Sequence, residues 1–255
     1  MTAILTPLVD RYASWLTRPA ASAADTSDED PAEVRAMPVI LRIERDPQPD
    51  RTALLEAAAA AALAVCLAPE AEGEWHPELR AWVNGRIRKV SRRARGAHWA
   101  AVHDLPGVTV EVDGAEARAL VPMRVSQTPK EVSRLQISGS ELPASTPGPV
   151  PAGAPVLWLN PDVPMTAGKA AAQVGHATML LAALMHASGQ HEALENWAAL
   201  DHRTAVRTPT PAAWAAAHPG ADPEAAWRDH GVVAVRDAGF TEVAPGTVTV
   251  LARWP

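Results

Sequence analysis

From residue 155 onward, short apolar runs alternate with longer segments of helical periodicity. Apolar runs bounded by Pro, Gly or Asn predict buried strands, whereas Thr or Pro ahead of an alanine-rich segment predicts a helix start. The pattern predicts strands at 155–160, 204–207, 231–236 and 247–252, and helices from Thr166 to about His186, at 191–200, and from Pro211 with an interruption at 218–223. Four strands with interleaved helices predict a compact α/β domain whose apolar last strand is central.

Two changes of composition divide the rest of the chain. Residues 19–33 are polar and acidic with no large apolar side chain to bury, which predicts a flexible linker. Residues 138–154 are rich in Pro, Gly and small polar residues, which predicts a stretch without regular structure and a domain boundary. We therefore expect an N-terminal helix and acidic linker at 1–35, an N-terminal lobe at 36–137, a linker at 138–154 and a C-terminal domain at 155–255.

The first residues carry apolar side chains at helical spacing, namely Leu8, Tyr12, Trp15 and Leu16. This spacing predicts a short amphipathic helix. We favour packing of that helix against the body of the protein. Membrane association is the weaker alternative, because few basic residues accompany the apolar ones.

Composition limits the compartment and the partners. With 255 residues and 47% hydrophobic residues the chain can form one large domain or two ordinary ones, and its net charge of -6 argues against a uniformly basic nucleic-acid binder. The single cysteine, Cys66, permits no intrachain disulfide, which favours a reducing compartment. No leader pattern is present, and only the weakly hydrophobic alanine run near residue 57 is long and apolar, so we expect a cytoplasmic protein without a membrane partner.

Lys169 is unusual in this sequence. The chain has only three lysines, Lys89, Lys130 and Lys169, while its other basic residues are arginines. Thr166 has the character of an N-cap, and the positive end of a helix dipole disfavours a cation in the first turn. A lysine retained in such a place indicates a chemical role and the binding of an anion.

Lys169, Gln173 and His176 share one face of the predicted helix, because they lie at positions i, i+4 and i+7. Solvent exposure is the ordinary reason for such a polar stripe. Gly168 and Gly175 favour another reason, since each costs about 1 kcal/mol of helix propensity relative to alanine. That cost indicates a close approach by another chain segment or a ligand, and we favour a stripe that lines a cavity.

A second polar cluster follows the predicted strand at 231–236. Asp237 lies at the strand end, where open α/β sheets commonly receive ligands. A turn aspartate that bonds its own backbone is the alternative. Thr241, Thr247 and Thr249 add hydroxyl groups nearby.

The two segments together resemble the signature of the peptidyl-tRNA hydrolase 2 family. Its first pattern, Gly-Lys-x-Ala-Ala-Gln-x-x-His-Ala, is matched at Gly168, Lys169, Ala171, Ala172, Gln173, His176 and Ala177. Its second pattern is matched at Asp237, Ala238, Gly239, Thr241, Val243, Pro245, Gly246, Thr247, Thr249 and Val250. The resemblance covers about residues 155–255, and two long motifs in the right order make it specific. We therefore expect a compact mixed four-stranded sheet with helices on both faces.

The resemblance implies hydrolysis of the ester that joins a peptide to the 3′ ribose of tRNA, with no cofactor and no metal. The residues it implies as catalytic are Lys169 and Asp237, with Gln173, Thr241 and Thr249 beside them and the basic residue Arg207 near them on the second strand. We place His176 and Arg207 among the substrate-binding residues. The composition agrees, because the predicted domain has no cysteine and one serine, Ser188, without a partnered base. We expect water to attack, Asp237 to orient or deprotonate it, and Lys169 with the helix N-terminus to stabilise the oxyanion.

The chain departs from the family pattern at Phe240, where the family usually has arginine. The substitution removes a cation that could meet phosphate. Phe240 could instead stack on an unpaired base, as aromatic side chains do, or pack against the protein.

The first half of the chain follows the order of the second. Pro38 begins an apolar run like that at Pro155, Trp82 and Trp99 are spaced like Trp197 and Trp214, and Gly107 and Asp113 are spaced like Gly231 and Asp237. We interpret residues 36–125 as a diverged copy of the C-terminal domain. In this register Thr52 replaces Lys169 and Glu56 replaces Gln173, so the copy is inactive. Since the family commonly forms homodimers, we expect a pseudo-dimeric monomer or a homodimer.

That lobe contains the one dense basic run of the sequence: Arg86, Arg88, Lys89, Arg92, Arg93, Arg95 and His98. A charged run is usually a solvated face. With a tRNA substrate, phosphate contact becomes the better explanation. If about five groups contact phosphates, log affinity falls with log salt at a slope of roughly -4.

Other classes of protein fit less well. A P-loop requires glycine where Val163 stands and Ser or Thr where Ala170 stands. No histidine pair has the His-Glu-x-x-His spacing of a metal hydrolase. The remaining alternative is a noncatalytic tRNA-binding module in which Lys169 and Asp237 are relics.

Overall fold

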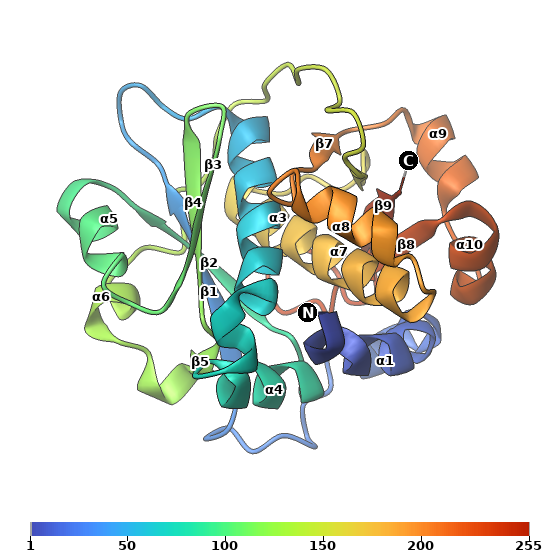
Figure 1. Cartoon of the computed structure of the whole chain (residues 1–255), viewed down its shortest axis with the longest axis horizontal. Coiled ribbons are helices and arrows are strands. Elements are labelled where there is room, and N and C mark those ends of the chain that lie inside the picture. The colour runs from blue at the N-terminus through green and yellow to red at the C-terminus, as the bar shows by residue number, and fades with distance from the viewer. Residues whose placement is uncertain (1, 255) are drawn as a thin grey trace.

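The computed structural model, which describes residues 2–254, contains two sheets of the same strand order on either side of a central pair of helices (Figure 1). The N-terminal lobe has the order β2-β1-β4-β3, with the short β5 paired to β1. Its strands are β1 (Arg35–Arg42), β2 (Lys89–Ala94), β3 (Gly107–Val112), β4 (Ala115–Leu120) and β5 (Met123–Arg124). The C-terminal lobe has the order β7-β6-β9-β8, formed by β6 (Val156–Leu159), β7 (Ala205–Arg207), β8 (Val232–Arg236) and β9 (Val248–Arg253).

The strand directions also agree between the lobes. In each lobe the first strand runs parallel to the second and antiparallel to the fourth, and the third pairs antiparallel with the fourth. Corresponding tryptophans make corresponding contacts, since Trp82 Nε1 donates to the Arg88 carbonyl at 3.0 Å and Trp197 Nε1 to the Arg203 carbonyl at 2.8 Å. The shared topology supports our interpretation of the N-terminal lobe as a copy, whereas the domain limits stay a prediction.

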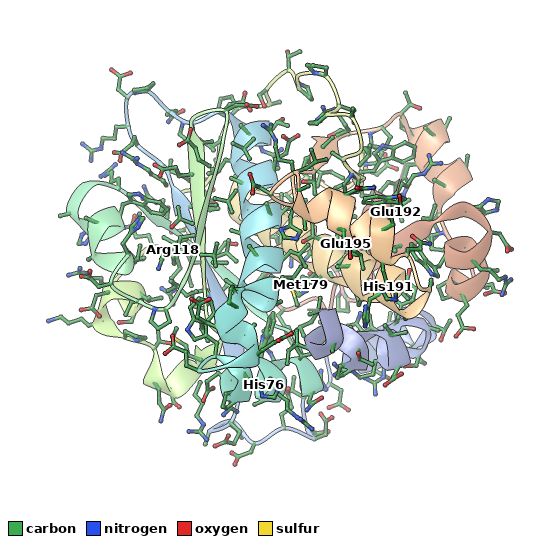
Figure 2. The ribbon with its side chains drawn as sticks, in the orientation of Figure 1. His76, Arg118, Met179, His191, Glu192 and Glu195 are labelled. Atoms are coloured by element: carbon green, nitrogen blue, oxygen red, sulfur yellow. The ribbon has the colours of Figure 1, made fainter. Side chains whose placement is uncertain are left out.

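Two alanine-rich helices, α3 (Arg51–Leu67) and α7 (Ala167–Ala187), pack against each other between the sheets (Figure 1). Small side chains allow their backbones to approach closely, so that a Cβ added to Gly175 would lie 2.9 Å from the Ala62 Cβ. Thr178 Oγ1 donates across the contact to the Ala59 carbonyl at 3.0 Å. The side chain of Met179 is fully buried beside this contact (Figure 2).

Helices also cover the outer faces of both sheets, which confirms the expected α/β architecture. On the C-terminal sheet, alternate residues point to opposite faces, so that Leu157, Val233 and Val250 join the core with α7 while Ala234 and Leu251 pack with Trp214 of α9. The remaining helices are α4 (His76–Asn84), α5 (Gly96–Val102), α6 (Lys130–Ser133), α8 (His191–Ala198), α9 (Pro211–Ala217) and α10 (Pro223–His230). On the N-terminal sheet, the buried Arg118 ties β4 to α5 by donating to the Val102 carbonyl at 3.0 Å (Figure 2).

The amphipathic N-terminal segment forms α1 (Thr6–Thr17), preceded by a 3-10 turn at Thr2–Leu5 and followed by α2 (Ala20–Ala23). It packs on the body of the protein as predicted, because Tyr12 Oη accepts from the Ala234 amide at 2.8 Å and Trp15 Nε1 donates to the Arg236 carbonyl at 3.0 Å. Further 3-10 turns lie at Pro69–Glu72 and Val125–Gln127. Between residues 2 and 254, no helix combines the length and apolarity needed to span a bilayer.

The predicted elements of residues 155–255 are confirmed, including the central position of β9 between β6 and β8. The interruption at 218–223 separates α9 from α10, which Asp222 caps by accepting from the Ala225 amide at 2.9 Å. Residues 138–154 contain neither helix nor strand, as expected from their composition. They pass over the N-termini of both central helices, where Ser145 accepts from the Thr52 amide and Ser140 from the Gly168 amide.

Candidate active site

Lys169 lies in the first turn of α7, as the sequence predicts. Thr166 caps the helix, its Oγ1 accepting from the Lys169 amide at 3.1 Å. The two preceding amides, of Ala167 and Gly168, donate to the backbone oxygen and the hydroxyl of Ser140, each at 3.1 Å. The protein itself therefore occupies the N–H groups that we expected to help hold an oxyanion, and the Lys169 side chain is the cation at this end of the helix.

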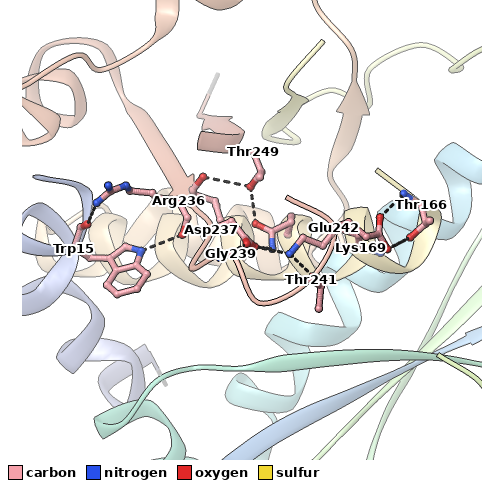
Figure 3. A network of polar contacts seen from close by, with 11 residues as sticks. Trp15, Thr166, Lys169, Arg236, Asp237, Gly239, Thr241, Glu242 and Thr249 are labelled. Carbon is pink, nitrogen blue, oxygen red and sulfur yellow. Dashed lines mark hydrogen bonds and ion pairs between the residues drawn. The ribbon is translucent and has the colours of Figure 1, made fainter. Parts of the chain in front are cut away.

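The Lys169 ammonium contacts two residues of the second motif (Figure 3). Its Nζ lies 2.6 Å from Asp237 Oδ2 and donates to Thr241 Oγ1 at 2.9 Å. The side chains of Lys169 and Asp237 are only 10% and 8% exposed. An ion pair so sheltered from solvent interacts more strongly than one at the surface, and two of the three ammonium protons are used.

Gln173 joins the same cluster one turn further along α7. Its Nε2 donates to Asp237 Oδ2 at 2.8 Å, and its Oε1 accepts from Thr249 Oγ1 of β9 at 2.5 Å. Gln173 and Thr249 are buried. Because the hydroxyl of Thr249 donates to the amide oxygen, it fixes the side-chain orientation in which the Gln173 nitrogen faces the carboxylate.

The loop after β8 holds Asp237 from the other side. Its Oδ1 accepts from the Gly239 amide at 2.7 Å, which is the turn contact of our alternative interpretation, so Asp237 both orders its own loop and faces Lys169. Gly239 has a φ of +85°, and a Cβ there would lie 2.4 Å from Pro245. Across the loop, Glu242 Oε1 accepts from Thr166 Oγ1 at 2.7 Å, so the loop is also fastened to the start of α7.

Only the last residue of the polar stripe of α7 faces the other lobe, since Lys169 and Gln173 contact the loop after β8 and strand β9. His176 Nδ1 lies 3.2 Å from Lys89 Nζ of β2, and the Lys89 amine sits 5.1 Å from the centre of the Trp82 ring. Burial lowers the pKa of Lys89 to about 7. Burial, followed by the charges of Lys89 and Lys169, lowers the pKa of His176 well below its usual value.

Both glycines of α7 have the close neighbours that their cost in helix propensity indicated. A Cβ on Gly168 would lie 2.8 Å from Ser140 Oγ, and one on Gly175 would meet Ala62 and the Lys89 stem. The neighbours are segments of this chain, so the glycines give no support to a cavity along the stripe, which stays a prediction.

Arg207 lies apart from the cluster. Its Nη1 donates to Glu56 Oε1 of α3 at 3.1 Å and its Nη2 to the Gly148 carbonyl at 2.7 Å. Glu56 also accepts from the Val206 amide at 2.9 Å, yet burial raises the pKa of this carboxyl. Glu56, the residue that our repeat interpretation aligns with Gln173, thus forms a contact between the lobes.

The basic run divides among several environments. Arg86 and Arg88 form ion pairs with Asp28 and Glu29 of the acidic stretch. The other arginines of the strand contact main-chain oxygens or are partly exposed: Arg92 donates to Leu135 at 2.7 Å, Arg93 donates to Ser138 at 3.0 Å, and Arg95 is partly exposed. Phe240 is 50% exposed, and the Arg88 guanidinium lies 5.4 Å from the centre of its ring.

A pocket of about 560 Å³ adjoins the start of α7. It is lined by Arg92, Leu135, Gln136, Ile137, Ser138, Ser140, Glu141, Thr166 and Glu242. The sequence analysis singled out Thr166 only as a cap and missed Ser140 and Glu242. Glu242 lies within the second motif and could have been noted there, whereas no sequence signal marks Ser140 inside a long irregular stretch.

The structure thus brings Lys169, Gln173, Asp237, Thr241 and Thr249 together, with His176 one turn away on the same helix. Comparisons with curated proteins and with solved structures each gave no significant match. The family model described as peptidyl-tRNA hydrolase PTH2 matches residues 155–255, the part of the chain that carries both motifs. Residues 155–255 of this chain therefore belong to the peptidyl-tRNA hydrolase PTH2 family.

Proposed function

We propose that this chain hydrolyses the ester between a peptide, or an N-blocked amino acid, and the 3′ ribose of tRNA. The family match supports a hydrolase of the peptidyl-tRNA type in general terms. The 2.6 Å contact between Lys169 Nζ and Asp237 Oδ2 carries the more specific proposal, because it joins the two motifs in one sheltered polar cluster. The roles of the individual residues follow from that geometry.

Asp237 is the residue that orients the attacking water. Three hydrogen bonds occupy its carboxylate, two on Oδ2 and one on Oδ1, so an acceptor position remains for a water proton. As the water oxygen bonds to the ester carbonyl carbon, one of its protons passes to Asp237. Gln173 acts as a positioning residue, because it donates to the carboxylate and is itself fixed by Thr249.

Lys169 stabilises the negative charge that develops on the carbonyl oxygen. Its third ammonium proton is free of the contacts to Asp237 and Thr241 and can donate to that oxygen. When the tetrahedral intermediate collapses, the ester C–O bond breaks and the ribose 3′ oxygen leaves. The Thr241 hydroxyl gives its proton to this leaving oxygen while Lys169 protonates Thr241 Oγ1, and Lys169 regains the proton that Asp237 took from water. The products are a free carboxylic acid and tRNA with a 3′ hydroxyl.

The surroundings of the cluster suit a nucleic-acid end. Phe240 offers a half-exposed ring beside Thr241, on which an unpaired base can stack. We assign phosphate contacts to the arginines of the basic run, Arg86, Arg88, Arg92, Arg93 and Arg95, and leave out Lys89 because its amine faces His176. His176 and Arg207 then act at the contact between the lobes. The pocket beside Thr166 and Glu242 is open to the acyl part of the substrate.

Release of free peptide from a purified N-blocked aminoacyl-tRNA tests the proposal. We expect multiple turnovers by the full chain without added metal or cofactor. Binding of the tRNA without release of peptide would favour the alternative, a noncatalytic tRNA-binding module derived from this family. If the chain showed no binding of the tRNA and no release, both functions would be excluded.

A further inference from the structure

The acidic stretch between α2 and β1 folds back onto two arginines at the edge of the candidate active site. We call residues 25–33 the acidic segment; its acidic side chains are Asp25, Asp28, Glu29, Asp30 and Glu33. Arg88 forms a bidentate contact with Glu29, in which Nη1 donates to Oε1 at 2.7 Å and Nη2 donates to Oε2. Arg86 Nη2 donates to Asp28 Oδ1 at 2.8 Å, and Arg86 Nε lies 3.4 Å from Glu29 Oε1.

Of these two arginines, Arg88 contacts the loop that carries Phe240 and Thr241. The guanidinium of Arg88 rests over the ring of Phe240, and the next residue, Thr241, accepts from Lys169. A group that replaced Glu29 on Arg88 would therefore lie near the ester that Lys169 and Asp237 address. In addition, Arg86 Nη1 is buried and has no hydrogen-bond partner among the described residues, so the pair retains a donor that the acidic segment does not use.

The chemistry of the contact suits a phosphate as well as a carboxylate. An arginine fork donates two parallel hydrogen bonds to either anion in the same geometry. The bond to Arg88 holds the pKa of Glu29 below its usual value, so the glutamate stays ionised at neutral pH. The side chain of Asp28 is 73% exposed, and ion pairs at an exposed surface contribute little free energy. The side chains of Arg88 and Glu29 are only 20% and 19% exposed, so a polyanion displaces Asp28 at low cost but must replace Glu29 with an equivalent two-bond contact on Arg88.

We infer that the acidic segment is an internal competitor for nucleic-acid phosphate, which occupies Arg86 and Arg88 until the backbone of the substrate displaces it. The identity of that substrate rests on the proposed function. A phosphate near the scissile ester then binds Arg88 only after Glu29 has left that side chain. The segment therefore lowers the affinity for a nucleic acid that contacts these arginines, because its binding must release Asp28 and Glu29.

A matched pair of variants tests the inference in the full chain. Glu29→Gln removes the charge on Arg88, whereas Asp30→Asn makes the same charge change one residue away, where the side chain only accepts from the Ala32 amide. The probe is deacylated tRNA, with binding followed by fluorescence anisotropy over a series of salt concentrations. We expect Glu29→Gln to tighten binding about two- to fivefold and Asp30→Asn to change it much less.

A second pair separates occupation of the arginines from general charge. In the Arg86→Gln/Arg88→Gln background we expect weaker binding, a salt slope reduced in magnitude by roughly 1.5, and no further effect of Glu29→Gln. The inference is overturned if Glu29→Gln and Asp30→Asn change the affinity for tRNA equally. It is also overturned if Glu29→Gln still changes the affinity in the Arg86→Gln/Arg88→Gln background, or if no variant binds tRNA. Circular dichroism melting checks that each variant folds.

Peptide release is measured separately on the same samples. If peptide is not released but the affinities shift as expected, the proposed hydrolysis is refuted and the competitor inference stands. Normal release with unchanged affinities refutes the competitor and leaves the proposed hydrolysis intact. The two conclusions can therefore fail independently.

Discussion

Lys89 and His176 face each other across the contact between the lobes, with Nζ and Nδ1 3.2 Å apart. The other groups that bear on this amine are Cys66 on α3 and the face of Trp82 on α4, and the charge of Lys169 acts on His176. None of these neighbours carries a carboxylate, so among the described residues no carboxylate compensates the charge of a protonated Lys89. The protein thus holds an amine where its charged form is disfavoured.

This arrangement predicts a pH dependence of stability. Burial lowers the pKa of Lys89 from 10.5 to about 7, so between these values the unfolded chain binds a proton that the folded chain does not. The free energy of unfolding therefore rises with pH over this interval, by at most about 1.4 kcal/mol per pH unit from this group. Cys66 makes the free energy of unfolding fall with pH above pH 9, because burial raises the pKa of its thiol to about 12. Urea unfolding between pH 7 and 9 is the measurement.

Lys89→Met supplies the comparison, since it keeps the length of the side chain and removes the charge. We expect this variant to be at least as stable as the parent at pH 7 and to show a flatter dependence on pH. The exposed Lys130→Met controls for loss of a lysine elsewhere. Parallel profiles for the parent and Lys89→Met would contradict the lowered pKa.

Loss of either member of the ion pair is expected to abolish most turnover without unfolding the protein. Lys169→Met removes the donor to the developing oxyanion and Asp237→Asn removes the proton acceptor, and each change should lower kcat by about 10²–10³-fold. Single-turnover release of peptide measures the effect. Lys130→Met and the exposed Asp162→Asn should behave like the parent. Near-normal kcat in both Lys169→Met and Asp237→Asn would refute the assignment.

The Thr249 hydroxyl supports catalysis through Gln173. Thr249→Val keeps the shape of the side chain but leaves Gln173 Oε1 buried without its donor, which costs about 1–3 kcal/mol. We expect a lower urea midpoint together with a lower kcat at an unchanged KM, because the amide no longer holds Asp237. Thr249→Ser should restore both quantities. Loss of stability with an unchanged kcat would limit Thr249 to a structural role.

Gly175 sets the distance between the central helices. Gly175→Ala places a methyl group 2.9 Å from the Ala62 Cβ and 3.2 Å from the Lys89 Cε, and such overpacking costs about 1–3 kcal/mol. The gain in helix propensity of about 1 kcal/mol offsets part of this cost. We expect net destabilisation that the second change Ala62→Gly relieves. Additive effects in this double-mutant cycle would show that the two positions do not interact.

The sequence predicts which residues meet in the polar cluster around Lys169 and Asp237, because the parts of this cluster obey local rules. A capped helix fixes which side chains share a face with Lys169, and a strand end fixes the place of Asp237. The basic run was harder to predict, because a count of charges ignores the alternation of a strand. In β2, Lys89 and Ser91 point towards α7, whereas Arg92 points the other way and donates to Leu135.

Contacts between distant segments left no sequence signal of their own. Arg207 was assigned to the catalytic cluster by family resemblance, and its partner Glu56 lies on the other lobe, 151 residues away along the chain. Glu29 likewise lies in a stretch whose composition predicts only flexibility, yet it meets Arg88 through the fold. Such pairs depend on how the lobes are docked, which hydrophobic periodicity does not encode.

In the register of our repeat interpretation, Glu56 on α3 corresponds to Gln173 on α7, and the two residues have different partners. In an assembly of two identical chains, every substitution at the shared surface is made twice, so a residue must suit both sides of the axis. A single polypeptide is free of that constraint. One half of this molecule has accordingly acquired an arginine-bound carboxylate that fastens the pair, while the other keeps an amide beside the reacting groups, and the two sites can evolve separately.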